Sequence, residues 1–535
     1  MQYDVAIVGG GINGAGILLD LTIRGLRCVL FEKVDFGWAT TSASSRLIHG
    51  GARYILNDIG VTYKSSKEAG ILTKIAPHLL SRKPFLIPSS NSIMIEAFDA
   101  YMSLYNIFSR LRGAKRKKRV SNEYVKSLTL GCVKSKYGGI LLEEYSTNPA
   151  RLTFSCIMSA FERGAKIFNH KEVLSVRKEN GFFHIISLDK LTGQKEHYKS
   201  KAIVNVSGPW SDITAERAGL TVRIRPTKGI HILFSGKPFD TILSFPSIDG
   251  RYLLLVPLEG YTILGTTDDD FFGDRDSPDI TFDDVEYLIR SAETVFPSIR
   301  KLKAYSTTVG LRPTVFKYGV LEDKITREYE VFNNDGFISV IGGKLASFRL
   351  LSEIVSDEVV RTLGVKKKSD TKNTKLYGAE DYSAEYYPDY ELYSKSISEK
   401  VAERFKIPKE ISDSLVRKYG CRVYDVLSSG NHSVLCQCRG VLECEIRWSI
   451  KNEFAKTPDD IMRRTGAGDG VCQGIMCICK IAQILQGYLN LDDKKTKELI
   501  TQFLKRKLKL AEPIKHISPD VYFTLLEYMK SSDIL

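Results

Sequence analysis

A glycine-rich turn near the N-terminus constrains the fold more than any other feature of the chain. In the stretch YDVAIVGGGINGAGILLDLTIRGLRCVLFEK, Gly9, Gly11 and Gly14 follow GxGxxG spacing between an apolar run and an expected helix. Such a strand–turn–helix unit presents free backbone N–H groups and the positive end of the helix dipole to a pyrophosphate. A second expected strand ends at Glu32, whose carboxylate is placed to accept a hydrogen bond from a ribose hydroxyl. The pattern predicts a Rossmann-like α/β domain that binds a dinucleotide, and it does not separate NAD from FAD.

The next stretch narrows the choice of cofactor. Residues 37–56, GWATTSASSRLIHGGARYIL, combine small hydroxylated side chains with the pair Gly50 and Gly51. Residues without bulky side chains let the backbone lie close to an extended cofactor. This stretch and GGGINGAG resemble FAD-dependent glycerol-3-phosphate dehydrogenases, within the larger group of flavin amine oxidases and dehydrogenases. The similarity continues in order through NVSGPWSD, LLLVPLEGYTILGTTDDDF, GLRPT, ITREYEV and VIGGKLASFR, and it covers about the first 360 residues.

The resemblance implies an architecture and a reaction. Residues 1–361 would form an FAD-dependent oxidoreductase domain, in which the dinucleotide-binding half is interleaved with an antiparallel-sheet substrate cap. The implied reaction is the oxidation of sn-glycerol 3-phosphate to dihydroxyacetone phosphate by hydride transfer to FAD. Since no cysteine or histidine stands out as a flavin-linking residue, we expect FAD to bind non-covalently. The residues that the resemblance implies for contact with FAD are Gly9, Gly11, Ile12, Asn13, Gly14, Glu32, Lys33, Ser42, Ser44, Ser45, Leu47, His49, Val173, Ser207, Gly208, Gly343, Lys344 and Leu345.

A phosphorylated alcohol sets clear demands on its pocket. Its carbon gives up a hydride to the flavin while its hydroxyl proton passes to a base. Its phosphate needs several cationic donors, and arginine matches the geometry of a phosphate with two parallel hydrogen bonds. The substrate contacts that the resemblance implies are Arg53, Tyr54, Thr266, Thr267, Arg312 and Arg327.

Three residues are expected to take part in the reaction itself, namely Arg312, His49 and Lys344. His49 has three interpretations: a proton-accepting base, a hydrogen-bond donor to the flavin, or a structural residue beside glycines. Lys344 would place a cation near the flavin and favour its reduced, anionic form, and the alternative is an ordinary exposed loop lysine. The sequence does not identify which residue accepts the proton.

The cysteines gather late in the chain, where seven of the ten lie between Cys421 and Cys479. The chain begins with MQYDVAIVGGG, which predicts a buried strand rather than a secretory signal, so we expect a reducing, cytoplasmic compartment. Metal binding or redox work is then a better interpretation than a disulfide framework.

The spacing of four of these cysteines, Cys436, Cys438, Cys472 and Cys477, departs from the CxxC pairs of most zinc sites. Together with RRTGAGDGVCQGIMCICK, it resembles the bacterioferritin-associated-ferredoxin-like [2Fe-2S] module at the C-terminus of the large subunit of anaerobic glycerol-3-phosphate dehydrogenase. The resemblance implies that the four thiolates hold a [2Fe-2S] cluster, through which electrons leave toward a quinone or a carrier subunit. Three alternatives stay open: zinc bound by the same thiolates, a ligand set with Cys479 in place of Cys477, and incidental cysteines that are buried without binding a metal.

Composition divides the chain beyond the flavin domain. Segment 362–378 is lysine-rich, polar and without periodicity, which predicts a linker. Residues 379–430 are expected to be helical, residues 431–490 to form the cysteine module, and residues 491–535 to form charged helices.

Lys and Arg outnumber Asp and Glu by 77 to 63, which indicates an anionic partner. No zinc-finger or RNA-binding motif is found, so nucleic acid is the weakest candidate. No run of about eighteen apolar residues is found, so no membrane-spanning helix is expected. The stretch FDAYMSLYNIFSRLRGAKRKKR predicts either peripheral contact with an anionic membrane or, more simply, a core helix followed by a solvated loop. We expect the protein to lie at the inner face of the cell membrane, with an anchor or carrier subunit as partner. The sequence leaves open whether the chain forms a homo-oligomer.

Two other functions stay open. A flavin dehydrogenase of an amino or hydroxy acid shares the fold and sometimes the cluster, but it needs one arginine for a carboxylate rather than three convergent cations. An electron-transfer subunit would keep flavin and cluster while a partner chain performs catalysis. That function would leave the GARY, GLRPT and ITREYEV similarities unexplained.

Overall fold

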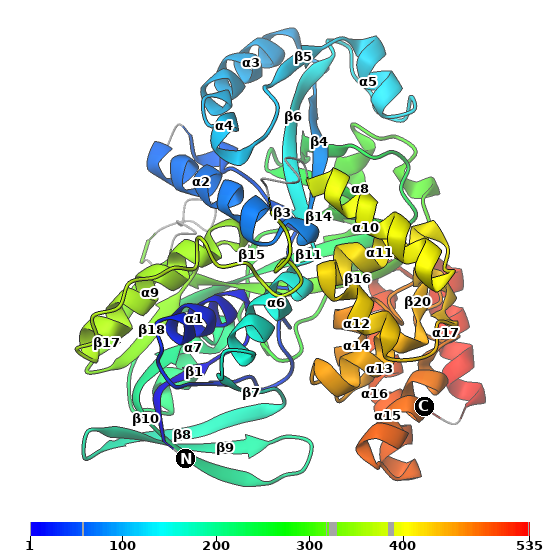
Figure 1. Ribbon diagram of the computed structural model, residues 1–535. Helices are drawn as coiled ribbons and strands as arrows, with labels where there is room; N and C mark the ends of the chain where they lie inside the picture. The colour runs from blue at the N-terminus through cyan, green and yellow to red at the C-terminus, as the bar shows by residue number, and fades with distance from the viewer. Residues whose placement is uncertain are drawn as a thin grey trace.

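A mostly parallel sheet forms the cofactor-binding half of the protein (Figure 1). The computed structural model describes residues 2–55, 58–316, 318–319, 329–383, 390–532 and 534. The sheet order is β17-β18-β10-β1-β2-β7, in which β18, β10, β1, β2 and β7 run parallel, and the β8–β9 hairpin continues it through β10. The strands are β1 (Gln2–Val8), β2 (Cys28–Phe31), β7 (Lys166–Phe168), β8 (Lys171–Glu179), β9 (Phe182–Asp189), β10 (Lys195–Asn205), β17 (Glu330–Asn334) and β18 (Phe337–Ile341).

Both faces of this sheet are covered, because successive residues of a strand point to opposite faces. Val5 and Ile7 of β1 pack into the core cluster formed with three helices. Ala6 and Val8 pack on the other face, in the cluster formed with the β8–β9 hairpin. The three helices are α1 (Ile12–Ile23), α6 (Pro149–Phe161) and α9 (Phe348–Thr362), and the short α7 (Ser211–Glu216) lies beside the hairpin cluster.

A second sheet forms the cap, in the order β15-β11-β14-β13-β12-β4-β6-β3, with β16 beside β11 and β5 beside β6. Its pairs are antiparallel except for β12 with β4. The strands are β3 (Leu47–Ile48), β4 (Leu80–Pro88), β5 (Lys118–Val120), β6 (Gly139–Thr147), β11 (Ile224–Ser235), β12 (Ile242–Pro246), β13 (Tyr252–Leu258), β14 (Tyr261–Gly265), β15 (Asp269–Asp270) and β16 (Ala304–Val315). The helices between them are α2 (Ile59–Ile75), α3 (Ser92–Asn106), α4 (Ser109–Arg112), α5 (Asn122–Leu128) and α8 (Phe282–Glu293). The chain passes back and forth between the two sheets, which confirms the predicted α/β fold with an interleaved antiparallel cap.

The C-terminal region is mostly helical and lies beside both sheets (Figure 1). It contains α10 (Tyr390–Phe405), α11 (Lys409–Tyr419), α12 (Val423–Ser428), β19 (Val434–Cys436), β20 (Val441–Leu442), α13 (Glu443–Asn452), α14 (Pro458–Thr465), α15 (Ile478–Leu489), α16 (Asp493–Ala511) and α17 (Pro519–Ser531). Among the described residues, each helix is either too short or too polar to cross a bilayer.

Segment 362–378, for which the polar composition predicts a linker, has neither helix nor strand beyond Thr362. It is nevertheless packed along the cofactor-binding half. Leu376 and Tyr377 belong to the core cluster around α1, and the backbone N–H of Tyr377 donates to the Ser159 hydroxyl at 2.8 Å. The segment therefore differs from a free tether because its last apolar residues are buried.

A buried ion pair joins the C-terminal region to α6. The Arg151 guanidinium donates to both carboxylate oxygens of Glu453, at 3.0 and 2.9 Å, and both side chains are almost fully buried. Arg151 also donates to the carbonyl of Lys418, at the end of α11. A buried charge that loses its partner is costly, so this pair is expected to matter for folding.

Glu453→Ala should lower the free energy of unfolding by about 3–5 kcal/mol, because it leaves the Arg151 guanidinium buried without its carboxylate. Glu512→Ala removes an exposed ion pair with Lys515 and should change it by less than about 1 kcal/mol. Urea unfolding followed by circular dichroism measures both variants. Equal unfolding midpoints would contradict the role of the buried pair.

Candidate active site

The candidate active site is a cavity of about 1690 Å³ between the two sheets. Its floor is formed by residues that directly follow β1, β2, β10 and β18, and its other walls come from segment 38–49, α3 and the cap strands β13 and β16. Open α/β sheets bind ligands in this position, outside the carboxyl ends of their parallel strands.

Two glycines make the turn after β1 possible. Gly9 has φ +115°, and a Cβ there would lie 2.5 Å from the carbonyl oxygen of Val206. A Cβ on Gly14 would lie 1.9 Å from the carbonyl oxygen of Gly9, so α1 packs directly on the turn. Gly11, the N-cap of α1, has no side chain to cap the helix, and the first helical turn holds no acidic residue. The N-terminal end of the α1 dipole therefore meets the cavity with no acidic residue in its own first turn, which fits the pyrophosphate of a dinucleotide.

Glu32 stands at the end of β2, where a ribose is expected. Its carboxylate accepts hydrogen bonds from the backbone N–H groups of Gly10 at 2.7 Å and Val34 at 2.9 Å. Burial raises the pKa of Glu32, while these two hydrogen bonds act in the opposite direction. The side chain is held in one orientation against the cavity, beside Lys33, whose ammonium lies 3.9 Å from the centroid of the Trp210 ring.

The loop after β18 closes the cavity next to the glycine turn. Gly342 and Gly343 have φ of +86° and +100°, and the Asn13 side-chain amide donates to the carbonyl of Gly342 at 3.2 Å. Lys344 follows, and its ammonium lies 3.8 Å from the centroid of the Tyr54 ring. Since Tyr54 and Lys344 both line the cavity, the structure brings these two predicted residues together.

The cap contributes Arg312, which extends from β16 into the cavity. Its guanidinium donates to Asp268 at 2.9 Å, to the Thr266 hydroxyl at 3.0 Å and to the carbonyl of Thr267 at 3.0 Å. Thr266 lines the cavity, whereas the buried Thr267 hydroxyl accepts a hydrogen bond from the Ile230 N–H and supports the strand behind it. Of the three predicted substrate arginines, Arg327 and the side chain of Arg53 lie outside the described residues.

His49 lines the cavity at the end of segment 38–49. Its Nδ1 accepts a hydrogen bond from the Gly51 N–H at 3.1 Å. A neutral imidazole that accepts through Nδ1 carries its proton on Nε2.

Most of the predicted FAD contacts converge on the cavity. Those that line it are Gly9, Gly11, Ile12, Asn13, Glu32, Lys33, Ser44, Ser45, Leu47, His49, Val173, Ser207, Gly208, Gly343, Lys344 and Leu345. Gly14 lies behind the turn, and Ser42 donates to the carbonyl of Gly37 at 2.6 Å, where it shapes the loop without lining the cavity.

Several site residues were not predicted from the sequence. Asp268 pairs with Arg312, and Trp210 stacks on Trp38 at 5.6 Å between ring centroids beside the cofactor cavity. Burial, followed by the charges of Arg312 and Arg46, lowers the pKa of His231 to about 3, so its imidazole is neutral, and its Nε2 lies 3.1 Å from the Ser45 hydroxyl. The acidic run after GTT in the GTTDDDF stretch was the available signal for Asp268.

The four predicted cysteine ligands converge from two segments. Cys436 and Cys438 flank a turn after β19, Cys472 lies in the glycine-rich loop after α14, and Cys477 precedes α15. A hydrogen bond with the Cys477 thiol lowers the pKa of Cys436 to about 6, against the effect of burial. The same bond, together with burial, raises the pKa of Cys477.

The second thiol pair is Cys438 with Cys472, which are also hydrogen-bonded to each other. Backbone N–H groups point at these sulfurs: those of Gly468 and Arg439 at Cys436, and that of Cys472 at Cys438. Such N–H groups stabilise thiolates in metal clusters. The other two cysteines of residues 431–490 lie apart, since Cys444 is buried in α13 and Cys479 contacts the Tyr528 hydroxyl at 3.5 Å.

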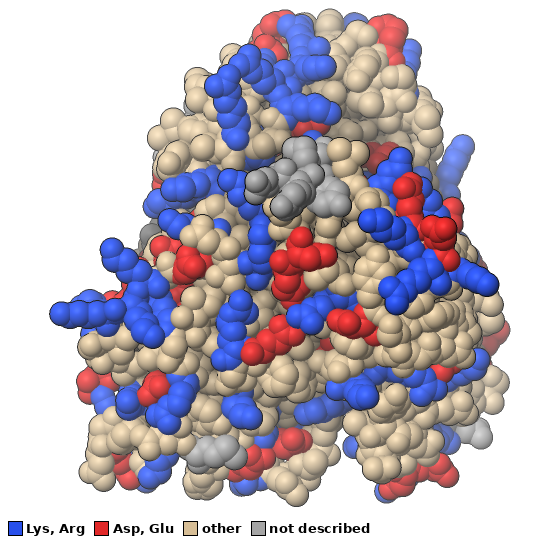
Figure 2. All heavy atoms as spheres, viewed as in Figure 1, with Lys and Arg blue, Asp and Glu red and all other residues tan. Residues whose placement is uncertain are grey.

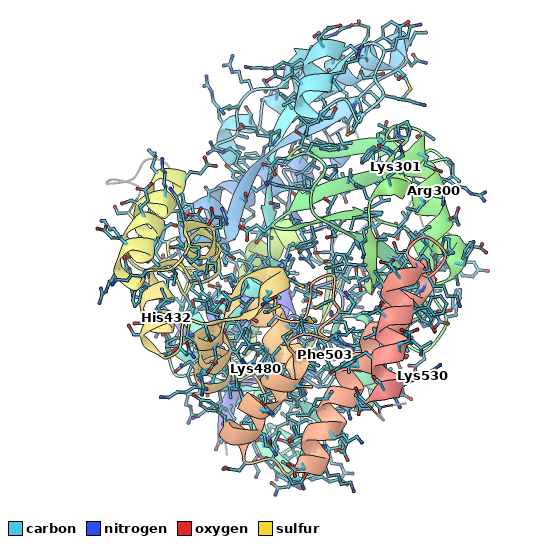
Figure 3. The ribbon with its side chains drawn as sticks, turned by 90° about the vertical axis from the view of Figure 1, so that its right-hand side faces the viewer. Arg300, Lys301, His432, Lys480, Phe503 and Lys530 are labelled. Atoms are coloured by element: carbon cyan, nitrogen blue, oxygen red, sulfur yellow. The ribbon has the colours of Figure 1, made fainter. Side chains whose placement is uncertain are left out.

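Glycines shape the loop that carries Cys472. A Cβ on Gly470 would lie 2.3 Å from the Cβ of Cys438, so only glycine lets the two cysteine segments approach. On the other side of the loop, a Cβ on Gly468 or Gly474 would lie within 2.8 Å of the ring of Phe503, which extends from α16 (Figure 3).

The cysteine module touches the wall of the active-site cavity. Arg46, which lines the cavity, donates to the Tyr261 hydroxyl. The Arg439 guanidinium lies 4.7 Å from the centroid of the same ring. Leu47, which lines the cavity, and Val471, which precedes Cys472, belong to one apolar cluster, so the cavity wall packs against the cysteine module.

A buried charge network fixes this arrangement. Asp35, three residues after Glu32, accepts hydrogen bonds from Arg463 at 2.8 Å and from Arg464 at 2.7 Å. Burial alone would raise the pKa of Asp35, but the charges of Arg464 and Arg463 outweigh it and hold that pKa well below its usual range. Among the described residues, Asp35, His170 and Asp460 form a group whose potential metal-binding atoms lie within 4.8 Å of one another. The two arginines already balance the two carboxylates, so a metal ion is not needed there.

Comparison with known proteins identifies the class. Residues 4–347 match the FAD dependent oxidoreductase family, and residues 369–496 match the C-terminal domain of alpha-glycerophosphate oxidase. The chain therefore belongs to the FAD dependent oxidoreductase family.

Within this family, the relatives are more specific. The chain is 31% identical over 493 residues to the aerobic glycerol-3-phosphate dehydrogenases of Staphylococcus epidermidis and Staphylococcus aureus, covering 87% of each chain. The structure of the glycerol-3-phosphate dehydrogenase from Bacillus halodurans complexed with FAD superposes with a TM-score of 0.76 at 25% identity, over 96% of both chains. Glycine oxidase from Geobacillus kaustophilus shares the fold, with a TM-score of 0.54 at 20% identity over 70% of this chain and 98% of that chain. The resemblance to FAD-dependent glycerol-3-phosphate dehydrogenases is thus confirmed. The relatives are of the aerobic type, and the match of residues 369–496 is to the C-terminal domain of alpha-glycerophosphate oxidase, so the resemblance of this region to the anaerobic large subunit stays a prediction.

Gly14→Ala should abolish FAD binding, because the added methyl group would overlap the carbonyl of Gly9 and force α1 away from the turn. We expect at least about a tenfold loss of bound flavin, measured by the flavin absorbance of the purified protein. Gly487→Ala is the matched control, since it also replaces a helical glycine and its Cβ would meet no atom within 4 Å. Full flavin content in Gly14→Ala would contradict the predicted cofactor site.

Proposed function

We propose that the protein oxidises sn-glycerol 3-phosphate to dihydroxyacetone phosphate, with non-covalently bound FAD as the hydride acceptor. The observation that carries the proposal is the convergence of the dinucleotide turn and Arg312 on one cavity. The names of the Staphylococcus and Bacillus relatives support the choice of substrate. When bound, FAD supplies the redox chemistry, and the protein supplies binding, orientation and charge.

Arg312 orients the substrate in this proposal. Asp268 and Thr266 hold its guanidinium in one plane, which fixes the direction in which the cation meets a phosphate or an alcohol oxygen. His49 acts as a hydrogen-bond donor to the flavin rather than as the base, since Nδ1 is occupied by the Gly51 N–H and the proton resides on Nε2. Lys344 adds a positive charge near the cofactor, which favours reduced flavin.

A flavin dehydrogenase of an amino or hydroxy acid is the second candidate. The observation in its favour is the ion pair of Arg312 with Asp268, because the carboxylate offsets the charge of the guanidinium. The cavity is then less positive than it would be with three arginines whose charges are not offset. Arg53 and Arg327 are the predicted additional cations, so substrate tests must decide between a phosphate and a carboxylate. An electron-transfer subunit would show reduction of its flavin only with a catalytic partner.

We also propose that the four converging cysteines hold a [2Fe-2S] cluster. The two thiol pairs support it, since each iron of such a cluster takes two thiolates. One zinc ion in four thiolates would need all four sulfurs within about 4 Å of one another. Among the described residues, the cysteines form no group of three within 4.8 Å, which favours two irons over one zinc.

A bound cluster would supply one-electron chemistry beside the cofactor cavity. The contacts of Arg46 and Arg439 with Tyr261 support this placement, because they join the cavity wall to the cysteine turn. Cys438 is exposed, so the proposed route ends at the surface, where a carrier subunit or a quinone takes the electrons.

Anaerobic mixing with glycerol 3-phosphate should bleach the flavin absorbance, whereas glycerol and amino acids should leave it unchanged. Arg312→Ala should slow bleaching by about 10–100-fold, because a charge-assisted contact with the substrate is lost, and should keep its FAD. Arg177→Ala, on the exposed part of β8, is the control and should behave as the wild type. Bleaching by an amino acid alone would support the second candidate, and no bleaching without a partner chain would support the third.

Anaerobically prepared protein should contain about two irons and two acid-labile sulfides per chain. Cys472→Ser should lose both, because the thiolate that pairs with Cys438 is removed. Cys444→Ser and Cys479→Ser are matched controls and should keep their iron, since neither lies with the four. Metal analysis that finds one zinc, or no metal, would overturn the proposed cluster while leaving the flavin reaction intact.

A further inference from the structure

A lysine side chain lies in the protein interior beside the cysteine module. Figure 2 shows the ordinary place of such residues, since Lys and Arg side chains stand on the outside of the molecule with Asp and Glu among them. Lys507 of α16 differs, because its side chain is only 2% exposed. Since lysine is almost never buried without a charged partner, this position calls for an explanation.

The buried face of α16 brings Lys507 to the loop between α14 and α15. Phe503 lies one turn before Lys507, and its ring packs directly on the backbone of Gly468 and Gly474 in that loop (Figure 3). The Lys507 ammonium lies 5.5 Å from the centroid of the same ring. Because Gly474 is three residues before Cys477, the ammonium is held next to the segment that carries two of the proposed cluster ligands.

Asp469, in the same loop, is the partner of Lys507. The ammonium lies 3.3 Å from a carboxylate oxygen of Asp469. The next residue, Gly470, lies against Cys438, since a Cβ on this glycine would be 2.3 Å from the Cβ of that cysteine. Burial lowers the pKa of Lys507, whereas the charges of Asp469 and Cys477 act in the opposite direction. The ion pair therefore lies within electrostatic reach of both thiol pairs.

Two further cations near this ion pair direct hydrogen bonds to uncharged groups. Arg439, the residue after Cys438, donates to a backbone carbonyl at 2.8 Å, and Arg46 donates to a tyrosine hydroxyl. Together with Lys507 they are three cations, against the one carboxylate of Asp469. An excess of partly buried cations is costly unless an anion lies among them. Four thiolates around two irons form such an anion, because the whole cluster carries a net negative charge.

We propose that the Lys507 ammonium raises the reduction potential of the proposed [2Fe-2S] cluster, and that Asp469 moderates this effect by pairing with it. Reduction adds one electron, and therefore one negative charge, to the four-thiolate site. A cation held nearby stabilises the reduced form more than the oxidised form, and a carboxylate does the reverse. A higher potential makes the cluster a better acceptor for electrons from reduced FAD. Lys507 is thus a positioning residue, and the inference rests on the proposed cluster but not on the substrate.

A purely structural ion pair leads to a different expectation. If Lys507 and Asp469 served only to hold the loop, removal of either partner would loosen the same segment, and both changes would lose iron or shift the potential alike. If their charges act on the cluster, the two changes must shift the potential in opposite directions. The sign of the shift therefore separates the two roles.

Redox titration of the anaerobically prepared protein, followed by the electron paramagnetic resonance signal of the reduced cluster, tests the proposal. Lys507→Met keeps the length of the side chain and removes its charge. It should lower the midpoint potential by about 59 mV or more, which is a tenfold change in the ratio of reduced to oxidised cluster. Asp469→Asn should raise the potential, and the double variant should lie between the two. Lys505→Met, at an exposed position of α16, is the matched control and should titrate as the wild type.

Equal potentials in the wild type and both single variants would overturn the inference, as would shifts of the same sign or loss of iron from both. Should Lys507→Met alone lose iron, the sign of the shift in Asp469→Asn decides. Wild-type protein that contains no iron, and takes up none when it is reconstituted with iron and sulfide, would overturn the proposed cluster and this inference together. Flavin bleaching by glycerol 3-phosphate in the same wild-type sample then shows whether the flavin reaction stands.

Discussion

The carboxylate of Asp35 makes the contacts that hold the cofactor-binding half and the cysteine module together. It lies three residues beyond Glu32 and binds two consecutive arginines of α14, the helix that leads into the loop of Cys472. Removing one partner from such a buried set leaves an uncompensated charge, so the network tolerates little change. The ribose end of the cofactor site and the glycine-rich cysteine loop are therefore positioned by the same group. Arg151 of α6 and Glu453, the residue after α13, form a second buried ion pair between the cofactor-binding half and the C-terminal region.

Local chemistry explains which parts of the fold were predictable. The glycine spacing predicted a helix directly after the turn, and α1 spans Ile12–Ile23, because the turn and the apolar runs on either side of it lie within about thirty residues. The pairing of β4 with β12 joins segments more than a hundred residues apart, and nothing in either segment specifies its partner. The segment before residue 378 was predicted as a linker from its lysines, whereas the burial of Leu376 and Tyr377 depends on α1 and α6 being in place.

The candidate site shows the same division. Residues within motifs, such as Gly9, Glu32 and Lys344, were predicted and lie on the cavity. Residues that act through a partner, such as Asp268 with Arg312 or His231 with Ser45, were missed because each partner is distant in the sequence and the two meet only in the folded protein. The cysteines were predictable because their spacing is itself unusual. Their pairing, Cys436 with Cys477 and Cys438 with Cys472, was not predictable, because it depends on how the turn after β19 approaches the loop after α14.

The interleaving of the two sheets has a consequence for biosynthesis. β1 is made first, yet its parallel neighbour β10 ends at Asn205 and the loop beside the glycine turn ends at Leu345. Contacts of such sequence separation form late, since the chain between them must first be closed. A nascent chain on the ribosome therefore carries an incomplete cradle until about two thirds of it has been translated. FAD is captured after that point, and premature termination anywhere upstream yields a polypeptide without flavin.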